Sequence, residues 1–477
     1  MAVSRIIIVG GGFSGISLAI RLLQLSEHRI DLRIVEPRAM LGEGVAYACA
    51  HPDHRLNGPA AGHSVVLDDP THLTRWCEAN RLLAEDPEAV SKDGAIFIRR
   101  RDFARYLRDT LACTEREAVQ GSRTTHVRDI ATGIERCGDA FCLRTARNDV
   151  LTSDMIFIAT GNPPTALPAV VAGLRGATVL IDDPFDIARL ADIPQHARVL
   201  VLGTGLTAMD VVSVLVRQRH GGAIVMMSRR GLRPRPHSTS RGSAGINLDR
   251  VNGPLPAYTL VGASAVRPWL RGLRQTIAAA QARGEGWHAA FDELRDVVWK
   301  LWPSLPEREK RRFHRMLRGW YDVHRFRIPP QTALLVRSAE ESGQLTVKKG
   351  RIAVAQRDGS QALVHLAGAD LPERFDVIVN ATGFDTKAVS PFLRVAIDSG
   401  VLSHDPGGVG FRVDANCCAL SDTGIAQRFL RVIGPPTAGT FGDPLGSVFI
   451  GAHIVRITPD VLECLATKQA MSVTPNV

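Results

Sequence analysis

The chain is predicted to fold as an α/β protein with two dinucleotide-binding, Rossmann-type domains, built on three-layer, mostly parallel sheets and carrying a helical insertion. Two repeated patterns lead to this prediction. A glycine-rich fingerprint follows an apolar segment near residue 10 and is repeated near residue 203. An apolar segment ending in Ala-Thr-Gly occurs at residues 154–161 and again at residues 376–383. A chain with two strand-turn-helix units of this kind is expected to hold two nucleotides.

The first fingerprint follows the apolar segment Ile6–Val9, which is short and β-branched, as buried parallel strands are. Its glycines, Gly10, Gly12 and Gly15, have the G-x-G-x-x-G spacing. The first allows a tight turn, the second lets the backbone approach a pyrophosphate, and the third lets the following helix pack closely. Ser14 lies in the first turn of that helix, where backbone N–H groups and the helix dipole face an anion.

A carboxylate follows at the place where a nucleotide ribose would lie. The second predicted strand, residues 31–36, ends in Glu36. A carboxylate at this position accepts hydrogen bonds from a ribose diol and repels a 2′-phosphate, which predicts FAD or NAD rather than NADP in the first unit. Arg101 and Val127 are predicted further contacts with this nucleotide.

The second fingerprint has the G-x-G-x-x-A form, with Gly203, Gly205 and Ala208 after the apolar segment 199–202. Its next strand ends in Ser228 followed by Arg229 and Arg230, so a basic pair replaces the acid. The planar fork of arginine donors matches phosphate oxygens, which favours NADPH over NADH at this site. NADH stays open, because a solvated basic loop would look the same in a chain this rich in arginine.

The two Ala-Thr-Gly strands flank the second fingerprint. Gly161 and Gly383 permit the backbone to turn sharply beside a cofactor, and both are predicted cofactor contacts. The arrangement resembles two-dinucleotide flavoproteins, in which the chain leaves the FAD domain, builds the nicotinamide-nucleotide domain and returns. The predicted domains are therefore residues 1–165 for the first part of the FAD domain, 175–375 for the NAD(P)H domain with a helical insertion at about 264–325, and 376–477 for the second part of the FAD domain.

Composition restricts the remaining classes of protein. The formal net charge of +10 is spread along the 477 residues without a tandem or aromatic-interleaved basic motif, so no nucleic-acid partner is predicted. No apolar segment is long enough to span a bilayer, and no secretory signal precedes the first strand, so no membrane association is expected. The eight cysteines are scattered and form no C-x-x-C pair, which disfavours a dithiol relay and predicts a cytoplasmic protein.

Histidines and tryptophans allow two interpretations each. His51, His54 and His63 lack a carboxylate at ligand spacing, so no metal site is predicted and these side chains are expected to be solvated. Four tryptophans lie in the helical insertion, at positions 287, 299, 302 and 320. Helix packing is the simpler interpretation of these tryptophans, and an aromatic cap that excludes water from a flavin is the alternative.

Four longer phrases make the chain resemble a bacterial FAD/NAD(P)-binding family that includes FAD-dependent urate hydroxylase and aspartate N-monooxygenase. The phrases are residues 44–47, 55–60, 228–237 and 320–329. Two departures are evident. Ala-Gly-His-Ser-Val at 61–65 replaces the usual Met-Ser-Ala stretch, and Gly434 begins Gly-Pro-Pro where many such flavoproteins have Gly-Asp, which leaves Asp443 as the nearest acid. The signature of Baeyer–Villiger monooxygenases is not found, so ketone oxygenation is not predicted.

The resemblance implies a flavin-dependent monooxygenase that uses NAD(P)H and O2. Urate hydroxylation to 5-hydroxyisourate, a step of purine catabolism, is the first hypothesis, and an anionic small molecule would suit a basic protein. N-hydroxylation of an amino acid such as aspartate is the alternative, followed by an NAD(P)H:acceptor oxidoreductase and by a flavin-holding redox sensor. Arg55, Asn57 and Arg325 are the predicted catalytic residues, because arginine pairs with anions and asparagine bonds to amide edges.

Overall fold

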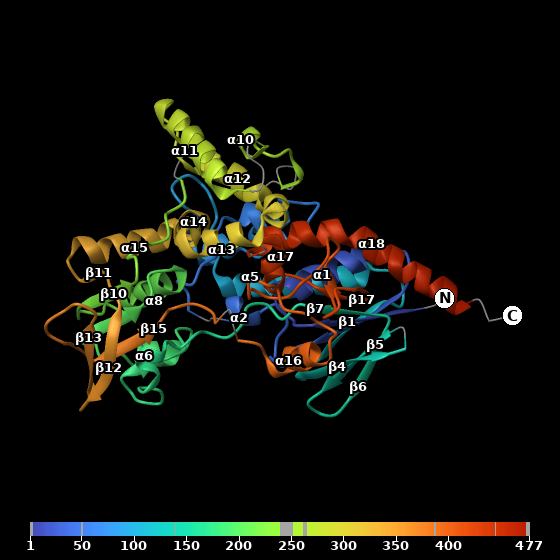
Figure 1. The fold of residues 1–477 in the computed structure, drawn as a ribbon, viewed down its shortest axis with the longest axis horizontal. Helices are drawn as coiled ribbons and strands as arrows, with labels where there is room; N and C mark the ends of the chain where they lie inside the picture. Colours follow the sequence, from blue (N-terminus) through green and yellow to red (C-terminus); the bar gives the residue numbers. More distant parts are fainter. Residues whose placement is uncertain are drawn as a thin grey trace.

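The computed structural model describes residues 3–473 except 49–50, 139, 239–250, 261–264, 386–387 and 444. Its largest sheet has six strands in the order β16-β17-β7-β1-β2-β3, and all neighbours are parallel except β16 and β17. The strands are β1 Ser4–Val9, β2 Ile30–Val35, β3 Arg123–Val127, β7 Met155–Ile158, β16 Cys418–Leu420 and β17 Ala426–Val432. Helices α1 Phe13–Leu25, α5 Arg100–Glu117 and α18 Ser447–Val473 pack together with this sheet (Figure 1).

A second sheet repeats the first with different residues. Its five strands have the parallel order β11-β10-β9-β15-β8, so β9 takes the place of β1, β10 of β2, β11 of β3 and β15 of β7. The strands are β8 Leu180–Ile181, β9 Val199–Leu202, β10 Ile224–Ser228, β11 Leu345–Lys349 and β15 Val377–Asn380. Helices α8 Leu206–Arg217 and α15 Pro330–Glu341 pack against each other beside it. The predicted fold class, two Rossmann-type domains, is confirmed.

One predicted domain boundary needs correction. We expected the chain to return to the FAD domain at residue 376, but β15 pairs with β9 and β8 of the second sheet. The reason is that each fingerprint strand needs a parallel neighbour ending in Ala-Thr-Gly, and β15 supplies it in the second domain as β7 does in the first. The return to the first sheet therefore follows β15.

Helices dominate the predicted insertion. They are α11 Val266–Ala282, α12 His288–Leu301, η3 Trp302–Ser304, α13 Glu307–Met316 and α14 Arg318–Arg325, and the short helix α10 Ala257–Leu260 precedes them. The insertion has a small apolar core that includes Trp269, Trp302 and Leu305. Trp320, in contrast, is 50% exposed. Figure 1 shows α11 and α12 projecting from the body of the molecule. The packing interpretation thus fits Trp302, and Trp320 lies outside that core.

Two small antiparallel sheets and several short helices complete the fold. The sheets contain β4 Ala131–Cys137, β5 Ala140–Thr145 and β6 Val150–Ser153, and β12 Ile352–Asp358, β13 Gln361–Leu366 and β14 Glu373–Phe375. The short helices are α2 Gly44–Tyr47, η1 Ala60–Gly62, α3 His72–Ala79, α4 Leu82–Glu85, η2 Pro87–Ala89, α6 Ala169–Ala172, α7 Ile187–Ala191, α16 Pro391–Asp398, η4 Pro435–Thr437 and α17 Ala438–Phe441. Within the described residues, no helix combines the length and hydropathy needed to cross a bilayer.

One pair of the cysteines is joined, although the sequence shows only scattered cysteines without a C-x-x-C pair. Cys137 and Cys142 form a disulfide in the β4–β5 hairpin, because the two antiparallel strands bring their α-carbons to 6.1 Å. The hairpin lies outside both nucleotide-binding units, so the disulfide does not create the dithiol relay that the sequence disfavoured. Cys77, Cys113, Cys417, Cys418 and Cys464 are free.

Candidate cofactor and substrate sites

Two glycines at the ends of β1 and β9 occupy equivalent environments. Gly10 has a φ of +112° and Gly203 a φ of +117°, both in a region that L side chains rarely adopt. A Cβ on Gly10 would lie 2.4 Å from the carbonyl oxygen of Ala159, and a Cβ on Gly203 would lie 2.1 Å from that of Ala381. Each fingerprint is therefore packed against the Ala-Thr-Gly turn of its own sheet, and only glycine fits at the contact.

The backbone beyond these contacts is open in both units. A Cβ on Gly205, Gly161 or Gly383 would meet no atom within 4 Å, so a cofactor could approach the main chain there. Gly12 and Gly205 are the N-cap residues of α1 and α8, and neither end has a side-chain cap. The first-turn N–H groups of both helices can therefore face a pyrophosphate. These residues fit the two predicted nucleotides.

Glu36 lies where the first nucleotide's ribose is predicted. Its side chain is buried and accepts hydrogen bonds from the backbone N–H of Gly11 at 2.9 Å and of Arg38 at 3.1 Å. The N–H of Glu36 itself donates to the carbonyl oxygen of Val127 at 3.1 Å. The structure therefore brings Glu36, Val127 and the first fingerprint together, as an FAD site requires.

Arginines at the start of α5 divide into an exposed and a buried one. Arg101, the predicted FAD contact, is 48% exposed and lies 4.0 Å from Asp102. Arg100 is buried instead, and its guanidinium donates to the carbonyl oxygen of Arg55 at 3.0 Å and pairs with Asp210 at 2.8 Å. Helical spacing could have revealed this, because Arg100 shares the buried face with residues 103, 104 and 107. A contact of Arg101 with FAD stays a prediction.

The basic end of β10 contacts the helical insertion. The Ser228 hydroxyl bonds to the Thr204 hydroxyl at 2.8 Å and accepts the N–H of Gly231 at 3.0 Å. Arg230 donates to the carbonyl oxygen of Arg315 in α13 at 2.9 Å, a contact that leaves its charge uncancelled, and Arg229 is exposed. The two guanidinium groups thus fit a phosphate at this site, and the preference for NADPH over NADH remains a prediction.

Ion pairs connect the second domain to the first. Arg100 of α5 pairs with Asp210 of α8, and both side chains are 9% exposed. Arg217, at the end of α8, pairs with Asp53 at 3.0 Å and with Glu88 at 2.6 Å. These contacts hold α8, whose N-terminus is the predicted pyrophosphate site of the second nucleotide, against α5 and the loops of the FAD domain.

Arg55 does not have the geometry of a substrate-binding residue. Its guanidinium makes a bidentate pair with Asp86, at 2.7 and 2.9 Å, and donates to the carbonyl oxygen of Phe97 at 2.9 Å. The side chain is 2% exposed, and Arg99 contacts the same carboxylate at 3.2 Å. Its two terminal nitrogens are therefore engaged inside the fold, whereas its Nε has no hydrogen-bond partner among the described residues. This geometry favours a structural role, and the catalytic role of Arg55 stays a prediction.

Asn57 lies among neutral histidines. Its side-chain oxygen is 3.4 Å from a guanidinium nitrogen of Arg100, and its backbone carbonyl contacts the ring Nε2 of His237 at 2.6 Å. Burial lowers the pKa of His237 to about 4 and also lowers the pKa of His63, whose ring packs edge-on against Phe103. These histidines are neutral at neutral pH.

His54 corrects the expectation of solvated loop histidines. It is only 1% exposed, and burial lowers its pKa to about 4. The loop that contains it is held beneath the second domain by the pair between Asp53 and Arg217, so polar loop residues become enclosed at the contact between domains. In the described part of the chain, no group of three or more His, Cys, Asp or Glu side chains is arranged to hold a metal ion.

Arg325 and Asp443 form a buried pair beside the start of α18. The guanidinium donates to Asp443 Oδ2 at 2.7 Å and to the carbonyl oxygen of Leu445 at 2.5 Å, and it lies over the ring of Phe449. The hydroxyl of Tyr321 donates to the same carboxylate oxygen at 3.0 Å, and burial together with this carboxylate raises the pKa of Tyr321 well above its ordinary value. Asp443 Oδ1 is buried without a hydrogen-bond partner among the described residues, so it can accept one from a bound molecule.

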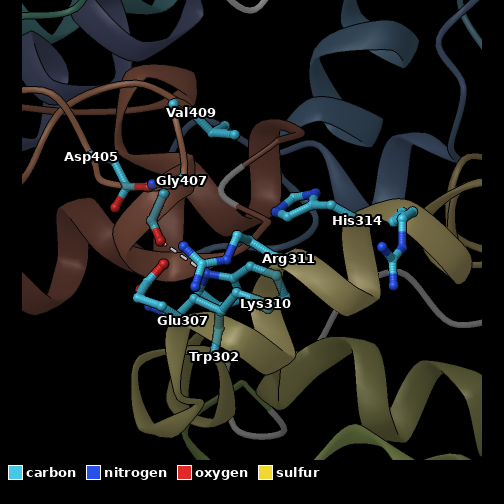
Figure 2. A pocket seen from close by; sticks show the side chains of 11 residues that line it. Trp302, Glu307, Lys310, Arg311, His314, Asp405, Gly407 and Val409 are labelled. Carbon is cyan, nitrogen blue, oxygen red and sulfur yellow. Dashed lines mark hydrogen bonds and ion pairs between the residues drawn. The ribbon is translucent and has the colours of Figure 1, made fainter.

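A cavity of about 460 Å³ adjoins the segment that leads to Asp443. It lies between α13, the loop 405–409 and Gly439 of α17, and Figure 2 shows side chains of both charge signs around it. Its charged and aromatic lining consists of Trp302, Glu307, Lys310, Arg311, His314, Arg315 and Asp405. Lys310 pairs with Glu307 at 3.0 Å, and the Trp302 indole N–H donates to the carbonyl oxygen of Gly439 at 2.9 Å. The helical insertion therefore supplies one wall of a chamber whose other wall belongs to the FAD domain.

Comparisons with known families and structures agree with this architecture. A family described as FAD-NAD(P)-binding matches residues 7–163, and the family L-lysine 6-monooxygenase/L-ornithine 5-monooxygenase matches residues 91–241. No curated protein matches the sequence. The fold resembles ornithine N-hydroxylase from Kutzneria sp. 744, with 16% identity, a TM-score of 0.64, and coverage of 98% of this chain and 100% of that one. It also resembles the cadaverine monooxygenase of Erwinia amylovora, with 13% identity, a TM-score of 0.63, and coverage of 96% and 94%.

The family matches confirm the coarser predictions. The protein is an FAD-dependent NAD(P)H monooxygenase, and FAD and an NAD(P)H cofactor are its nucleotides. The predicted resemblance to an FAD/NAD(P)-binding family is confirmed at that level, while neither matching family description mentions urate or purine metabolism. The structural likeness, at these low identities, establishes the fold.

Proposed function

We propose that the protein hydroxylates the side-chain amine of a free amino acid, as an N-monooxygenase that uses FAD, NADPH and O2. The observation that carries this proposal is the match of residues 91–241 to the L-lysine 6-monooxygenase/L-ornithine 5-monooxygenase family. This segment includes α5, the second fingerprint and the basic end of β10, so it extends from the first nucleotide unit into the second. The match favours the N-hydroxylation alternative over urate hydroxylation.

The pairing of the arginines also weighs against an anionic substrate such as urate. The family resemblance suggested urate, whose negative charge would suit a basic protein, but Arg55 is paired with Asp86 and Arg325 with Asp443. Arg327, a third arginine near the insertion, makes a bidentate pair with Asp292. Since each charge is already matched by a buried carboxylate, these three side chains offer little net attraction to an anion.

Amine hydroxylation needs a nitrogen with a free lone pair, and therefore an unprotonated amine. A desolvated surrounding disfavours the charged form of an amine and lowers its pKa. The region around Asn57 has this character, because burial keeps His63 and His237 neutral. The unpartnered Oδ1 of Asp443 could accept a hydrogen bond from the substrate or from the flavin. These groups would orient the amine and exclude water.

The cavity in Figure 2 suits the carboxylate and the α-ammonium group of an amino acid, at the end opposite the side-chain amine. Arg311 and Arg315 could bind a carboxylate, and Asp405 could bind an ammonium group, so the lining matches a zwitterion better than a diamine or a purine. Asp405 is held in position because its carboxylate accepts the N–H of Gly407 at 2.8 Å. A volume of about 460 Å³ is within the usual range for small-molecule sites.

The cofactors supply the oxidising chemistry when bound, since NADPH reduces the flavin and the reduced flavin activates O2. The protein would hold FAD through the first fingerprint and Glu36, and NADPH through the second fingerprint with Arg229 and Arg230. Its further contribution is to position the amine and to keep water away from the reacting atoms.

The test is a substrate panel with the purified, FAD-loaded protein. L-ornithine, L-lysine, cadaverine, L-aspartate and urate are supplied separately, while NADPH oxidation and O2 uptake are followed together. We expect one of the basic amino acids to stimulate both rates in equal measure and to yield a product heavier by one oxygen atom, with a hydroxylamine group. Coupled turnover of urate, or NADPH oxidation that no amine stimulates, would refute the proposal.

A further inference from the structure

A second hollow lies on the side of α13 that faces away from the cavity in Figure 2. This basic groove runs between α11 and α13 and has a volume of about 550 Å³. Its lining consists of Val266, Arg267, Leu270, Arg271, Arg274, Gln275, Ala278, Arg312, Phe313, Met316 and Leu317. Neither nucleotide unit contributes to this lining, so the proposed function assigns no role to the groove.

Arginines form the rim of the basic groove. Arg267, Arg271 and Arg274 follow one another along one exposed side of α11, at the four- and three-residue spacing of a helix face. No described carboxylate lies within ion-pair distance of these three side chains, and the fourth, Arg312, is 3.8 Å from Glu309. The lining contains no acidic residue. Arg267, Arg271 and Arg274 are therefore an uncompensated row of positive charge, whereas Arg312 is paired with Glu309.

Apolar side chains form the floor of the groove. Leu270, Phe313 and Leu317 are partly buried there, and Met316 is 50% exposed although it is a large apolar residue. The groove follows α11 from Val266 to Ala278, a distance of about 18 Å at the helical rise, which equals about three turns of a second helix. Figure 1 shows α11 projecting from the rest of the molecule, and the exposure of Arg267, Arg271 and Arg274 shows that a partner can reach the rim.

We propose that the basic groove is the docking site for an acidic amphipathic helix of a partner protein. Such a helix places apolar residues at i, i+3, i+4 and i+7 on the floor, and its glutamates or aspartates on the arginine rim. A second copy of this chain is a poorer occupant, because two molecules with a formal net charge of +10 repel each other. A bilayer surface is poorer as well, because the apolar residues lie at the bottom of a hollow and not on a protruding face.

Docking at this position has a structural consequence for the cavity on the other side of α13. Lys310, Arg311 and His314 face the cavity, while Phe313 and Met316 face the groove, so one helix is shared by both. A bound partner would therefore press on a wall of the cavity without entering it. The groove inference itself does not depend on the identity of the amine substrate.

The test measures binding of a fluorescein-labelled peptide to the full-length, FAD-loaded protein by fluorescence anisotropy. The probe is a peptide of about 14 residues made of glutamate and leucine, with leucines at i, i+3, i+4 and i+7. Two control peptides have the same composition in scrambled order, or lysine in place of glutamate. We expect the acidic helical probe alone to bind, and its affinity to fall as salt is raised.

Two groove variants are compared with a control of equal charge change. The triple variant Arg267→Glu, Arg271→Glu and Arg274→Glu should weaken binding by about tenfold or more, since three ion pairs are reversed. The variant Met316→Ser should also weaken peptide binding, because it removes an apolar contact from the floor of the groove. The control replaces three arginines on other exposed surfaces, Arg337, Arg357 and Arg394, by glutamate and should change the affinity by less than about twofold.

Three results would overturn the docking inference. The first is equal binding of the scrambled and the helical peptide, and the second is an equal loss of affinity in the control variant. The third is the absence of peptide binding together with self-association, measured by sedimentation, or binding to anionic vesicles that the groove variants abolish. Self-association would assign the groove to a second copy of the chain, and vesicle binding would assign it to a lipid surface. NADPH oxidation by each variant without substrate shows that it has folded and retained its flavin.

Discussion

The equivalence of Gly10 and Gly203 allows the two nucleotide sites to be disabled separately. In the variant Gly203→Ala, the new methyl group would lie 2.1 Å from the carbonyl oxygen of Ala381, at a residue with a φ of +117°. The overlap requires β9 and β15 to shift apart. Overpacking of this kind costs about 1–3 kcal/mol, and the unfavourable φ adds about 1–2 kcal/mol.

A companion variant separates strain from ligand binding. Gly205 has an ordinary extended φ, and a Cβ there would meet no atom within 4 Å. Gly205→Ala should therefore leave the melting temperature within about 2 °C of the parent protein, because no contact is disturbed. Its methyl group would nevertheless occupy the space through which a pyrophosphate approaches the chain, so the KM for NADPH should rise by about tenfold or more.

The assay combines three measurements on each variant. Flavin absorbance gives the FAD content, stopped-flow bleaching of the flavin gives the affinity for NADPH, and thermal unfolding gives the stability. Gly205→Ala and Gly203→Ala should both retain FAD and lose NADPH affinity, and only Gly203→Ala should also lose stability. Gly10→Ala should lose FAD, because its methyl group would lie 2.4 Å from the Ala159 carbonyl oxygen. Loss of FAD from the Gly203→Ala or Gly205→Ala protein, with unchanged NADPH affinity, would refute the assignment of the two units.

Buried or unmatched charges give three further predictions. Arg55→Ala should lower the free energy of unfolding in urea by about 3–5 kcal/mol without raising the substrate KM, because Asp86 stays buried and loses its bidentate partner. A KM effect without destabilisation would support the catalytic role. Combined Arg229→Ala and Arg230→Ala should raise the KM for NADPH by about tenfold and leave that for NADH within about twofold, and equal effects would contradict the phosphate contact. Burial lowers the pKa of His453 to about 3, so between about pH 6.5 and 3 this histidine is protonated in the unfolded chain and neutral in the folded one. The free energy of unfolding should therefore fall as the pH drops through this range. His453→Phe should reduce this fall, as measured by urea titrations at pH 7 and pH 5.

The fold could be predicted because short local patterns determine it. Residues 6–15 and 199–208 each contain a strand, a turn and a helix start, and the turn needs glycine for reasons that lie within the segment and its neighbouring strand. Glu36 followed from the same local spacing, and the structure places it at the first fingerprint. The position of the return to the first sheet was misassigned, since β15 looks the same in sequence whichever sheet it joins.

The substrate side could not be predicted in the same way, because ion pairs join residues far apart in the chain. Arg55 is 31 residues from Asp86, and Arg325 is 118 residues from Asp443. The sequence pattern around an arginine does not show whether its side chain will pair with a carboxylate after folding or remain available to an anion. The sequence indicates Asp443 only as the acid nearest to Gly434, where many flavoproteins have Gly-Asp. Its pairing with Arg325 and Tyr321 depends on how α14 packs against the start of α18.

The pair between Arg100 and Asp210 affects how the enzyme can move during turnover. Both side chains are enclosed between α5 and α8, so rotating the NADPH domain away would expose two charges separately. Both charges would regain their hydration in the rotated arrangement, so separating them costs less than the roughly 3–5 kcal/mol of leaving one of them buried without its partner. Any rotation of the NADPH domain during turnover must therefore break this pair and form it again, and such a domain motion can limit the rate at which the spent nicotinamide leaves.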